Sequence, residues 1–491
     1  MVKENTTSHA FFFTVIFMTS VVVITIVGYF IFLPKTAPKL ITVAVLPFDA
    51  PEEFPTHLTS SFPEHITELV AASRDVYVVD YAAAEEAVAL EHRSRGFRNE
   101  LGTTHIVDGS FEVSVEQQDA WILKMRLIDV SKDVWKLKWE EKFAHPELSV
   151  LEIRNLIVIN VAEKLYDNTI PDPSSDGLDS VTLEQYLLAL AEYREYSSLE
   201  PAMKLVYRKE HASPYMSELL KKMLPDAPMS WRKEWVELAL SNNSNYYSTQ
   251  VTQAQLKYEE RKNLVTYLRE MTFLAGQFPN SSAVGELAIL YFDLGWFEDA
   301  QDLLLRWAQI RPRSSKPALA IAFNRFRRDD LKGVEEALEI ARLRDKDNKL
   351  VDRYRALYEW KVKGKELNTE DLDYLIWIER FENKDFSPSD PEWNSYVEDL
   401  SCVAQVELRL YLNIHDYIFD SIDCNDNRLW LQPPPWWAED DPKWIAFRED
   451  SRYVGWIETK GVRSDVLKVL EPVNVKELFA PRRKVLNSDG G

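Results

Sequence analysis

His57 and His65 are the closest pair among the eight histidines of the chain, and Glu64 and Glu68 lie beside them. Imidazole and carboxylate groups at this spacing could hold a zinc ion if they shared one face of a helix. Pro63 interrupts the interval, however, and no third ligand is evident, whereas catalytic zinc sites use three protein ligands. We therefore predict no metal site in this stretch.

The sequence lacks the short motifs that bind phosphate groups or activate a nucleophile. It contains neither a P-loop nor a dinucleotide-binding glycine pattern, and 14 glycines in 491 residues leave little material for phosphate-binding loops. Ser110 follows a glycine, but no histidine or acid is placed around it, which favours a bend in a strand over nucleophilic catalysis. The sequence thus predicts no catalytic residue, no cofactor and no metal. Paired carboxylates are interpreted as parts of solvated surfaces, and they are Glu85 and Glu86, Glu140 and Glu141, and Asp329 and Asp330.

An enzyme with an unfamiliar site remains an open alternative. Asp49 and Asp80 each follow a short apolar run that is typical of a buried strand. The carboxyl ends of parallel strands are where α/β folds bind ligands, so a cleft could form near residues 47–50 and Asp80. The residues around these positions suggest no substrate.

The composition is that of a folded and strongly acidic chain. Hydrophobic residues make up 46% and charged residues 28% of the sequence, and the length corresponds to roughly two to four domains. The formal net charge is −21, so the surface repels phosphate backbones. We therefore predict no nucleic-acid partner.

Cys402 and Cys424 are the two cysteines of the chain. They are too few for a metal site of four cysteines, and the residues between them are typical of a helix and a turn that could bring the ends together. One disulfide and two separately buried thiols are both compatible with the sequence. An oxidising compartment would favour the disulfide.

The N-terminal region predicts a membrane anchor. Residues 10–33 contain no charged side chain, and as a helix they would be about 36 Å long, enough to cross a hydrocarbon core of about 30 Å. This run exceeds the apolar core of a cleaved signal peptide. We expect a stub at residues 1–9, a transmembrane helix at 10–33 and a large head after it, with an orientation that charge alone does not decide.

Residues 40–170 predict an α/β domain with a mixed sheet and flanking helices. Two short apolar runs are each followed by a helical pattern, and three alternating segments then indicate antiparallel strands. A long helix closes the domain, and the turn-rich residues 171–177 mark its boundary. The predicted strands are 41–46, 76–79, 105–115, 120–130 and 134–143, and the predicted helices are 58–72, 81–92 and 148–166.

Three segments of this domain resemble a known family. They read VAVLPF at 43–48, ELGTTHIVDGSFEV at 100–113 and LKMRLIDVSKDVWKLKWEEKF at 123–143. They are similar to the TolB-like N-terminal domain in the periplasmic part of CadC-type regulators and in adenylate-cyclase-like proteins. This resemblance implies a bacterial protein with a periplasmic head. Within the pattern, Gly102 is expected to end a helix and Gly109 to let a strand bend or be approached closely.

Residues 178–425 are expected to form a divergent helical array. The stretch 281–312 resembles a tetratricopeptide repeat, a motif of 34 residues that forms two packed helices. Trp307 departs from the motif, because a small residue is expected there and an indole would push the next helix outward. A second, degenerate repeat follows 34 residues later. The repeat-defining residues are Ala288, Tyr291, Gly295, Phe297, Ala300 and Pro312 in the first copy, and Ala322 and Ala341 in the second.

The aromatic-rich residues 426–470 are expected to cap the helical array, and residues 471–491 are expected to form a tail. Exposed ends of stacked helix pairs need such a cap. A ligand-facing aromatic patch is the alternative. The aromatic residues expected on the packed face are Trp444, Phe447, Tyr453 and Trp456.

These features together favour a non-enzymatic, membrane-anchored interaction scaffold in a bacterial inner membrane, with its head in the periplasm. Helix-pair repeats form extended concave surfaces, so the expected partner is a protein or peptide bound in a groove. The alternative is a sensory or regulatory component that signals through a partner. In the resembling family a DNA-binding or cyclase domain commonly precedes the span, and because only residues 1–9 do so here, we expect no output domain of its own.

Overall fold

The computed structural model describes most of the chain between residues 41 and 479. The predicted stub, the predicted span at 10–33 and residues 480–491 lie outside the described residues. The described residues from Thr42 onward belong to one compact unit. The described ranges are 41–71, 76–89, 101–113, 120–132, 134–165, 178–196, 229–242, 247–345, 348–365, 391–398, 402–412 and 431–479, with residues 198, 219, 377, 378, 380, 400, 418, 419 and 429.

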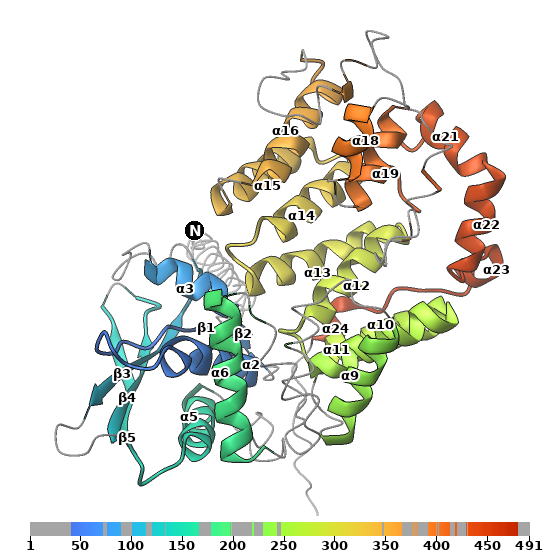
Figure 1. The fold of residues 1–491 in the computed structure, drawn as a ribbon. Helices are drawn as coiled ribbons and strands as arrows, with labels where there is room; N and C mark the ends of the chain where they lie inside the picture. The colour runs from blue at the N-terminus through green and yellow to red at the C-terminus, as the bar shows by residue number, and fades with distance from the viewer. Residues whose placement is uncertain are drawn as a thin grey trace, which may run out of the picture. The chain divides into compact units, whose positions relative to one another are not determined.

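The N-terminal part of the described chain is a mixed five-stranded sheet with helices packed on it (Figure 1). The strand order is β2-β1-β3-β4-β5; β1 and β3 are parallel, whereas β3, β4 and β5 are antiparallel neighbours. The predicted mixed sheet with flanking helices is therefore confirmed. The strands are β1 (Ile41–Val45), β2 (Val76–Val78), β3 (His105–Val113), β4 (Trp121–Asp129) and β5 (Lys136–His145), and the helices are η1 (His57–Ser61), α2 (Phe62–Ala71), α3 (Tyr81–Ala89), α5 (Val150–Leu165) and α6 (Ser180–Tyr196).

The antiparallel half of the sheet has one buried and one solvated face. Along β4 the buried Leu123 and Met125 alternate with the half-exposed Lys124 and Arg126, as the period of two in a strand requires. The solvated face carries ion pairs between neighbouring strands. These are Lys124 with Glu140 at 3.1 Å, Lys142 with Glu112 at 3.3 Å, and Arg126 with Asp108.

Two glycines occupy positions where a side chain would not fit the backbone or its neighbours. Gly102 has a φ of 64°, the left-handed conformation expected of it. A Cβ atom on Gly109 would lie 2.6 Å from the Phe48 ring and 2.9 Å from the Met125 sulfur. The expected close approach to this strand is therefore confirmed, and it allows Phe48 to pack in the core.

The rest of the described chain is helical, and no strand follows β5 among the described residues, as predicted. The helices from α9 to α16 pack against one another in chain order, and the C-terminal helices run back beside them (Figure 1). Tyr258 on α10 thus donates a hydrogen bond to the Lys460 carbonyl, and the Val473 amide donates one to the Tyr291 hydroxyl. These helices are α9 (Met229–Asn242), α10 (Tyr247–Arg261), α11 (Leu264–Gln277), α12 (Ser282–Asp293), α13 (Phe297–Ile310), α14 (Ser315–Arg327), α15 (Leu331–Arg344), α16 (Lys349–Lys361), α18 (Pro391–Glu398), α19 (Cys402–Tyr411), α21 (Pro442–Glu449), α22 (Ser451–Thr459), α23 (Ser464–Leu467) and α24 (Val475–Leu478).

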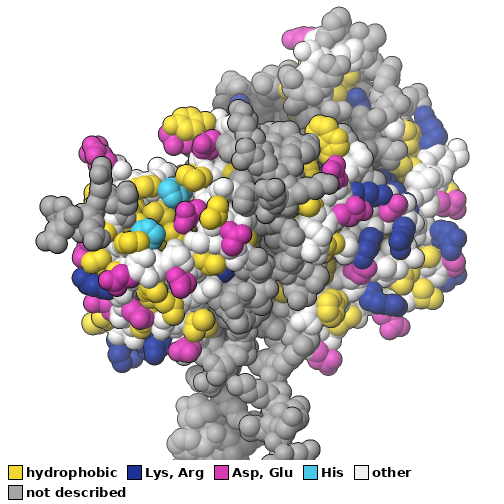
Figure 2. Space-filling model, turned by 60° about the horizontal axis from the view of Figure 1, so that its bottom comes forward, with side chains coloured by type: hydrophobic (Ala, Val, Ile, Leu, Met, Phe, Trp, Pro, Cys, Tyr) yellow, Lys and Arg dark blue, Asp and Glu magenta, His cyan; other side chains and the backbone are white. Residues whose placement is uncertain are grey.

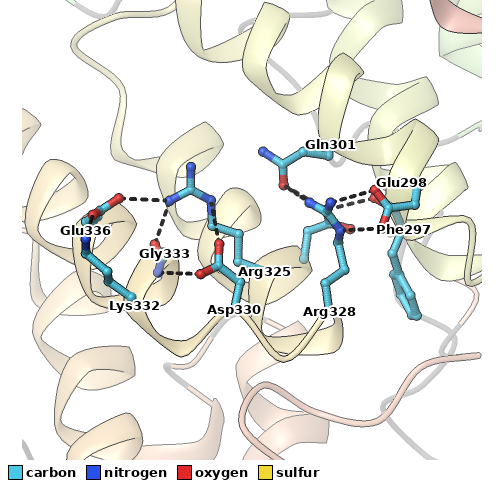
Figure 3. A network of polar contacts seen from close by, with 10 residues as sticks. Phe297, Glu298, Gln301, Arg325, Arg328, Asp330, Lys332, Gly333 and Glu336 are labelled. Atoms are coloured by element: carbon cyan, nitrogen blue, oxygen red, sulfur yellow. Dashed lines mark hydrogen bonds and ion pairs between the residues drawn. The ribbon is translucent and has the colours of Figure 1, made fainter.

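A polar network joins α13 to the turn between α14 and α15 (Figure 3). Arg328 donates two hydrogen bonds to the Glu298 carboxylate, at 2.9 and 2.5 Å, in the paired geometry that suits a guanidinium group. Arg325 donates to the Gly333 carbonyl at 2.9 Å, and the Asp330 carboxylate accepts from the Gly333 amide to cap α15. The network fixes the connection between the successive helices.

The predicted localisation in a bacterial inner membrane is contradicted. Among the described residues, no helix combines the length and the hydrophobicity that a membrane crossing requires. The longest described helix, α6, has 17 residues, and charged side chains including Glu184 and Arg194 interrupt its apolar positions. We therefore withdraw the expectation of a single-pass inner-membrane protein.

The Trp307 indole is accommodated inside its own helix pair. A Cβ atom on Gly285, in the facing helix α12, would lie 2.8 Å from the indole carbon Cε2. The small residue that the motif places at Trp307 is thus exchanged for a small residue at Gly285 on the opposite helix. The size of one position compensates for the other, as close packing of a protein interior demands.

Replacement of Gly285 by valine should therefore lower the free energy of unfolding by about 1–3 kcal/mol, because the new methyl groups would collide with the indole. Adding Trp307→Ala should recover part of that loss. Urea unfolding of the two variants measures both effects. Gly455→Val is the matched control, since a Cβ atom there meets nothing within 4 Å. Equal losses in Gly285→Val and Gly455→Val would contradict the compensation.

Candidate functional site

A proline- and tryptophan-rich segment, residues 431–437, lies across the helical array, and we call it the strap. Its Trp436 ring contacts the rings of Phe323, Phe326 and Tyr358 edge-on, with centroid distances of 5.2, 5.5 and 5.0 Å. The indole nitrogen donates a hydrogen bond of 2.8 Å to the Tyr354 carbonyl. The array thus buries both the apolar and the polar part of this side chain.

Arg327, at the end of α14, holds the backbone of the strap. Its guanidinium group donates hydrogen bonds to the carbonyls of Pro433 at 2.8 Å, Pro434 at 3.3 Å and Trp437 at 2.5 Å. Proline has no amide proton, so the carbonyls are the only backbone groups that these prolines offer. The fixed fork of donors in arginine suits several carbonyls at once.

The strap carries local backbone strain at its centre. Trp436 has a φ of 67°, a left-handed conformation that is rare for a bulky side chain and costs on the order of 1–3 kcal/mol. Contacts on both sides maintain it. The Tyr411 hydroxyl donates to the Pro435 carbonyl at 2.9 Å, and the Tyr411 ring lies edge-on to Trp437.

A pocket of about 290 Å³ lies beside the strap and is left open by it. It shares Phe323 and Tyr354 with the surroundings of Trp436, so the two are parts of one surface. We call this surface of α12, α14 and α16 the groove. Apart from Lys316 and the Tyr354 hydroxyl, the pocket is apolar, and its walls are Ile289, Phe292, Leu304, Trp307, Leu319, Ala320, Phe323 and Leu350.

Lys316 supplies the positive charge at this pocket. It is exposed at the start of α14, and it has no ion pair within the part of the chain that the structure describes. The preceding Ser315 donates a hydrogen bond to Asp345 and accepts one from Asn348, which fixes the start of α14 against the turn before α16. In a chain with a net charge of −21, an uncompensated lysine at an apolar pocket attracts acidic groups.

The repeat-defining residues hold the helices together and do not line the pocket. Gly295 adopts a φ of 80° in the turn between α12 and α13, Phe297 begins α13, and Pro312 lies buried in the turn before α14. The sequence interpretation missed the groove residues Arg327 and Lys316, whose importance depends on distant contacts. Fully buried at 0% exposure are Ala288, Tyr291, Ala300, Ala322 and Ala341.

The histidines considered for a metal site have separate surroundings. His65 is completely buried; Arg154 lies 3.4 Å from its Nε2 atom, and its ring packs edge-on against Tyr186. These contacts join α2 to α5 and α6, so His65 is part of the core. His57 lies in η1 and lines a different pocket.

The acids and the serine considered for catalysis are parts of the α/β framework. The Asp80 carboxylate accepts a hydrogen bond from the Ala83 amide at 2.8 Å and so caps α3. Burial raises the pKa of Asp80 above its ordinary value. Asp49 pairs through its backbone with Gly109 and Phe111 of β3, and Ser110 lies within the same pairing. The structure does not bring Asp49 and Asp80 into one described pocket.

The predicted aromatic residues of the C-terminal segment lie in the core of the helical array. Trp444, Phe447, Tyr453 and Trp456 are all buried there. Cys402 begins α19, whereas Cys424 lies outside the described residues, so a disulfide between them stays a prediction.

Comparison with known proteins gives no relative from which a function could be transferred. No family model matches the chain, and no curated protein matches it either. Arguments about function therefore rest on the groove and the pockets themselves.

Proposed function

We propose that the chain is a non-enzymatic binding protein whose groove receives an extended segment of a partner protein. The observation that supports this most is the strap, because a segment of the chain itself lies on α14 and α16 through Trp436 and Arg327. Helical grooves commonly bind segments through a few side chains that enter pockets. The open pocket next to the strap offers one such place.

The pocket lining indicates the chemistry of the partner. A volume of about 290 Å³ is at the lower end for ligand pockets and suits one large apolar side chain rather than a cofactor. Lys316 at the same pocket favours an acidic side chain close to that apolar one. The proposed partner segment therefore combines leucine, phenylalanine or tryptophan with a neighbouring aspartate or glutamate.

We also propose that the two parts of the described chain are a TolB-like domain and a tetratricopeptide-type array. For the array, the support is a repeated backbone feature. Gly295 and Asp329 are 34 residues apart, have φ angles of 80° and 57°, and each follows the first helix of a pair. For the α/β domain, the support is the sheet order together with the strand positions of the three resembling segments.

Selection of peptides from a random display library on the full chain tests the proposed binding. We expect enriched peptides to carry a large apolar residue next to an acid, and Lys316→Glu to weaken their binding about tenfold, because an attractive charge becomes a repulsive one. Lys332→Glu is the matched control, since its side chain is 89% exposed on α15 and the net charge changes equally. The proposal fails if no motif is enriched or if both variants bind the peptides alike.

A further inference from the structure

A second pocket, with a volume of about 630 Å³, lies in the α/β domain at the ends of β3 and β5 and the start of β4. The loop after β1 and the helix η1 form its other side. Figure 2 shows histidine side chains among hydrophobic ones, with acidic side chains near them, on the left-hand part of the molecule. The lining residues that carry the argument are Glu53, Phe54, His57, Trp121, His145 and Glu184.

The walls of this pocket are aromatic rings held in fixed positions. Phe54 stacks on Phe111 with a centroid distance of 4.3 Å, and Trp121 lies edge-on to Phe111 at 5.1 Å. His145 stacks on Trp121 at 4.8 Å with an interplanar angle of 12°. Rings that are fixed by other rings form a preorganised surface, and a ligand does not have to order them.

Most polar groups that face the pocket accept hydrogen bonds. The carboxylates of Glu53 and Glu184 are acceptors, and Glu184 uses one of its oxygens for the Ser180 hydroxyl. The Nδ1 atom of His145 lies 3.1 Å from the Leu148 carbonyl and must donate to it, which leaves Nε2 of the neutral ring as an acceptor. The described lining residues include no lysine and no arginine.

His57 adds a neutral imidazole to this lining. Burial lowers its pKa below the ordinary value, because a charged ring loses hydration there, so His57 is uncharged at neutral pH. Its helix η1 is a π-helix, a widened form that occurs often at functional sites. The pocket therefore combines aromatic walls and acceptors with two carboxylates and no opposing positive side chain among the described residues.

We propose that this pocket binds a small organic cation with an aromatic body, such as a primary arylalkylamine in its ammonium form. The ring of the ligand packs against Phe54 and Trp121, and the ammonium group donates hydrogen bonds to Glu184 and to the acceptor nitrogen of His145. Ammonium groups are also attracted to the faces of aromatic rings. This site is separate from the groove, and the inference does not depend on the proposed partner segment.

Calorimetric titration of the full chain with phenethylammonium tests this inference, and 3-phenylpropionate is the matched ligand with the same ring and the opposite charge. We expect phenethylammonium to bind and 3-phenylpropionate to give no heat at the same concentration. The isosteric variant Glu184→Gln should weaken the binding of phenethylammonium about tenfold, which corresponds to the loss of one charge-assisted hydrogen bond.

Glu449→Gln is the control variant, because Glu449 is exposed on α21 and lies outside the lining of this pocket. An unchanged melting temperature verifies that each variant folds; if Glu184→Gln does not fold, Glu53→Gln takes its place with the same expected weakening. The inference is overturned if phenethylammonium does not bind, if both ligands bind equally well, or if Glu449→Gln weakens binding as much as the pocket variant does.

Discussion

Replacement of Trp436 by alanine is expected to lower the free energy of unfolding by about 3–5 kcal/mol, the range typical for removal of a large buried aromatic side chain. Trp436 is 3% exposed and contacts three rings of α14 and α16. Alanine would leave a cavity there and would leave the Tyr354 carbonyl without its indole donor. The left-handed backbone would remain strained, because alanine also disfavours a positive φ.

The strap should then separate from the groove before the array unfolds. Urea unfolding gives the free energy, and limited proteolysis around residues 431–437 reports release of the strap. Trp135→Ala is the matched control, since Trp135 is 38% exposed, and we expect a loss below about 1 kcal/mol for it. Cleavage of the strap at the same rate in Trp436→Ala and in the unchanged chain would show that Trp436 does not hold it.

Asn280→Ala is expected to cost about 2–4 kcal/mol, because Asn280 completes the hydrogen bonding of the edge strand β2. Its amide group donates to the Val76 carbonyl at 2.7 Å and to the Ala71 carbonyl at 3.3 Å, and its oxygen accepts from the Val78 amide at 3.4 Å. These partners are buried and lie about 200 residues away in the sequence. Alanine would leave several of them without a partner.

Hydrogen exchange localises the effect of this change. We expect the Val78 amide to exchange faster in Asn280→Ala, with the largest changes confined to β2 and the segment before α12. Asn160→Ala is the control, because Asn160 makes its hydrogen bonds to Glu141 and Leu156 at the surface and should cost below about 1 kcal/mol. Uniform acceleration across the whole chain would instead indicate a general loss of stability, and equal costs for both variants would contradict the role of Asn280.

The α/β domain was predictable from the sequence because its strands follow a local rule. The alternation of apolar and polar residues predicted a strand at 120–130, and the structure has β4 at Trp121–Asp129. The closing helix predicted at 148–166 is α5, Val150–Leu165. The helix predicted at 58–72 is divided between η1 and α2, since periodicity does not distinguish a π-helical turn from an α-helical one.

The groove could not be predicted in the same way, because contacts between distant residues create it. Arg327 and the carbonyl of Pro433 are 106 residues apart, and neither position carries a periodic signal. The run of three prolines and two tryptophans at 433–437 was the available signal. It indicates an extended segment, but it does not say which helices will bind that segment. Lys316 likewise resembles any surface lysine until Leu350 and Tyr354 are placed near it.

The two edges of the sheet determine how large the sheet can become. At β2 the amide side chain of Asn280 occupies the hydrogen-bonding groups that a sixth strand would need. At β5 the exposed Lys136, Lys138 and Lys142 line the other edge, and a strand from another molecule would have to remove their charges from water. One edge is therefore closed by hydrogen bonds and the other is protected by charge, so the sheet resists growth into an aggregate.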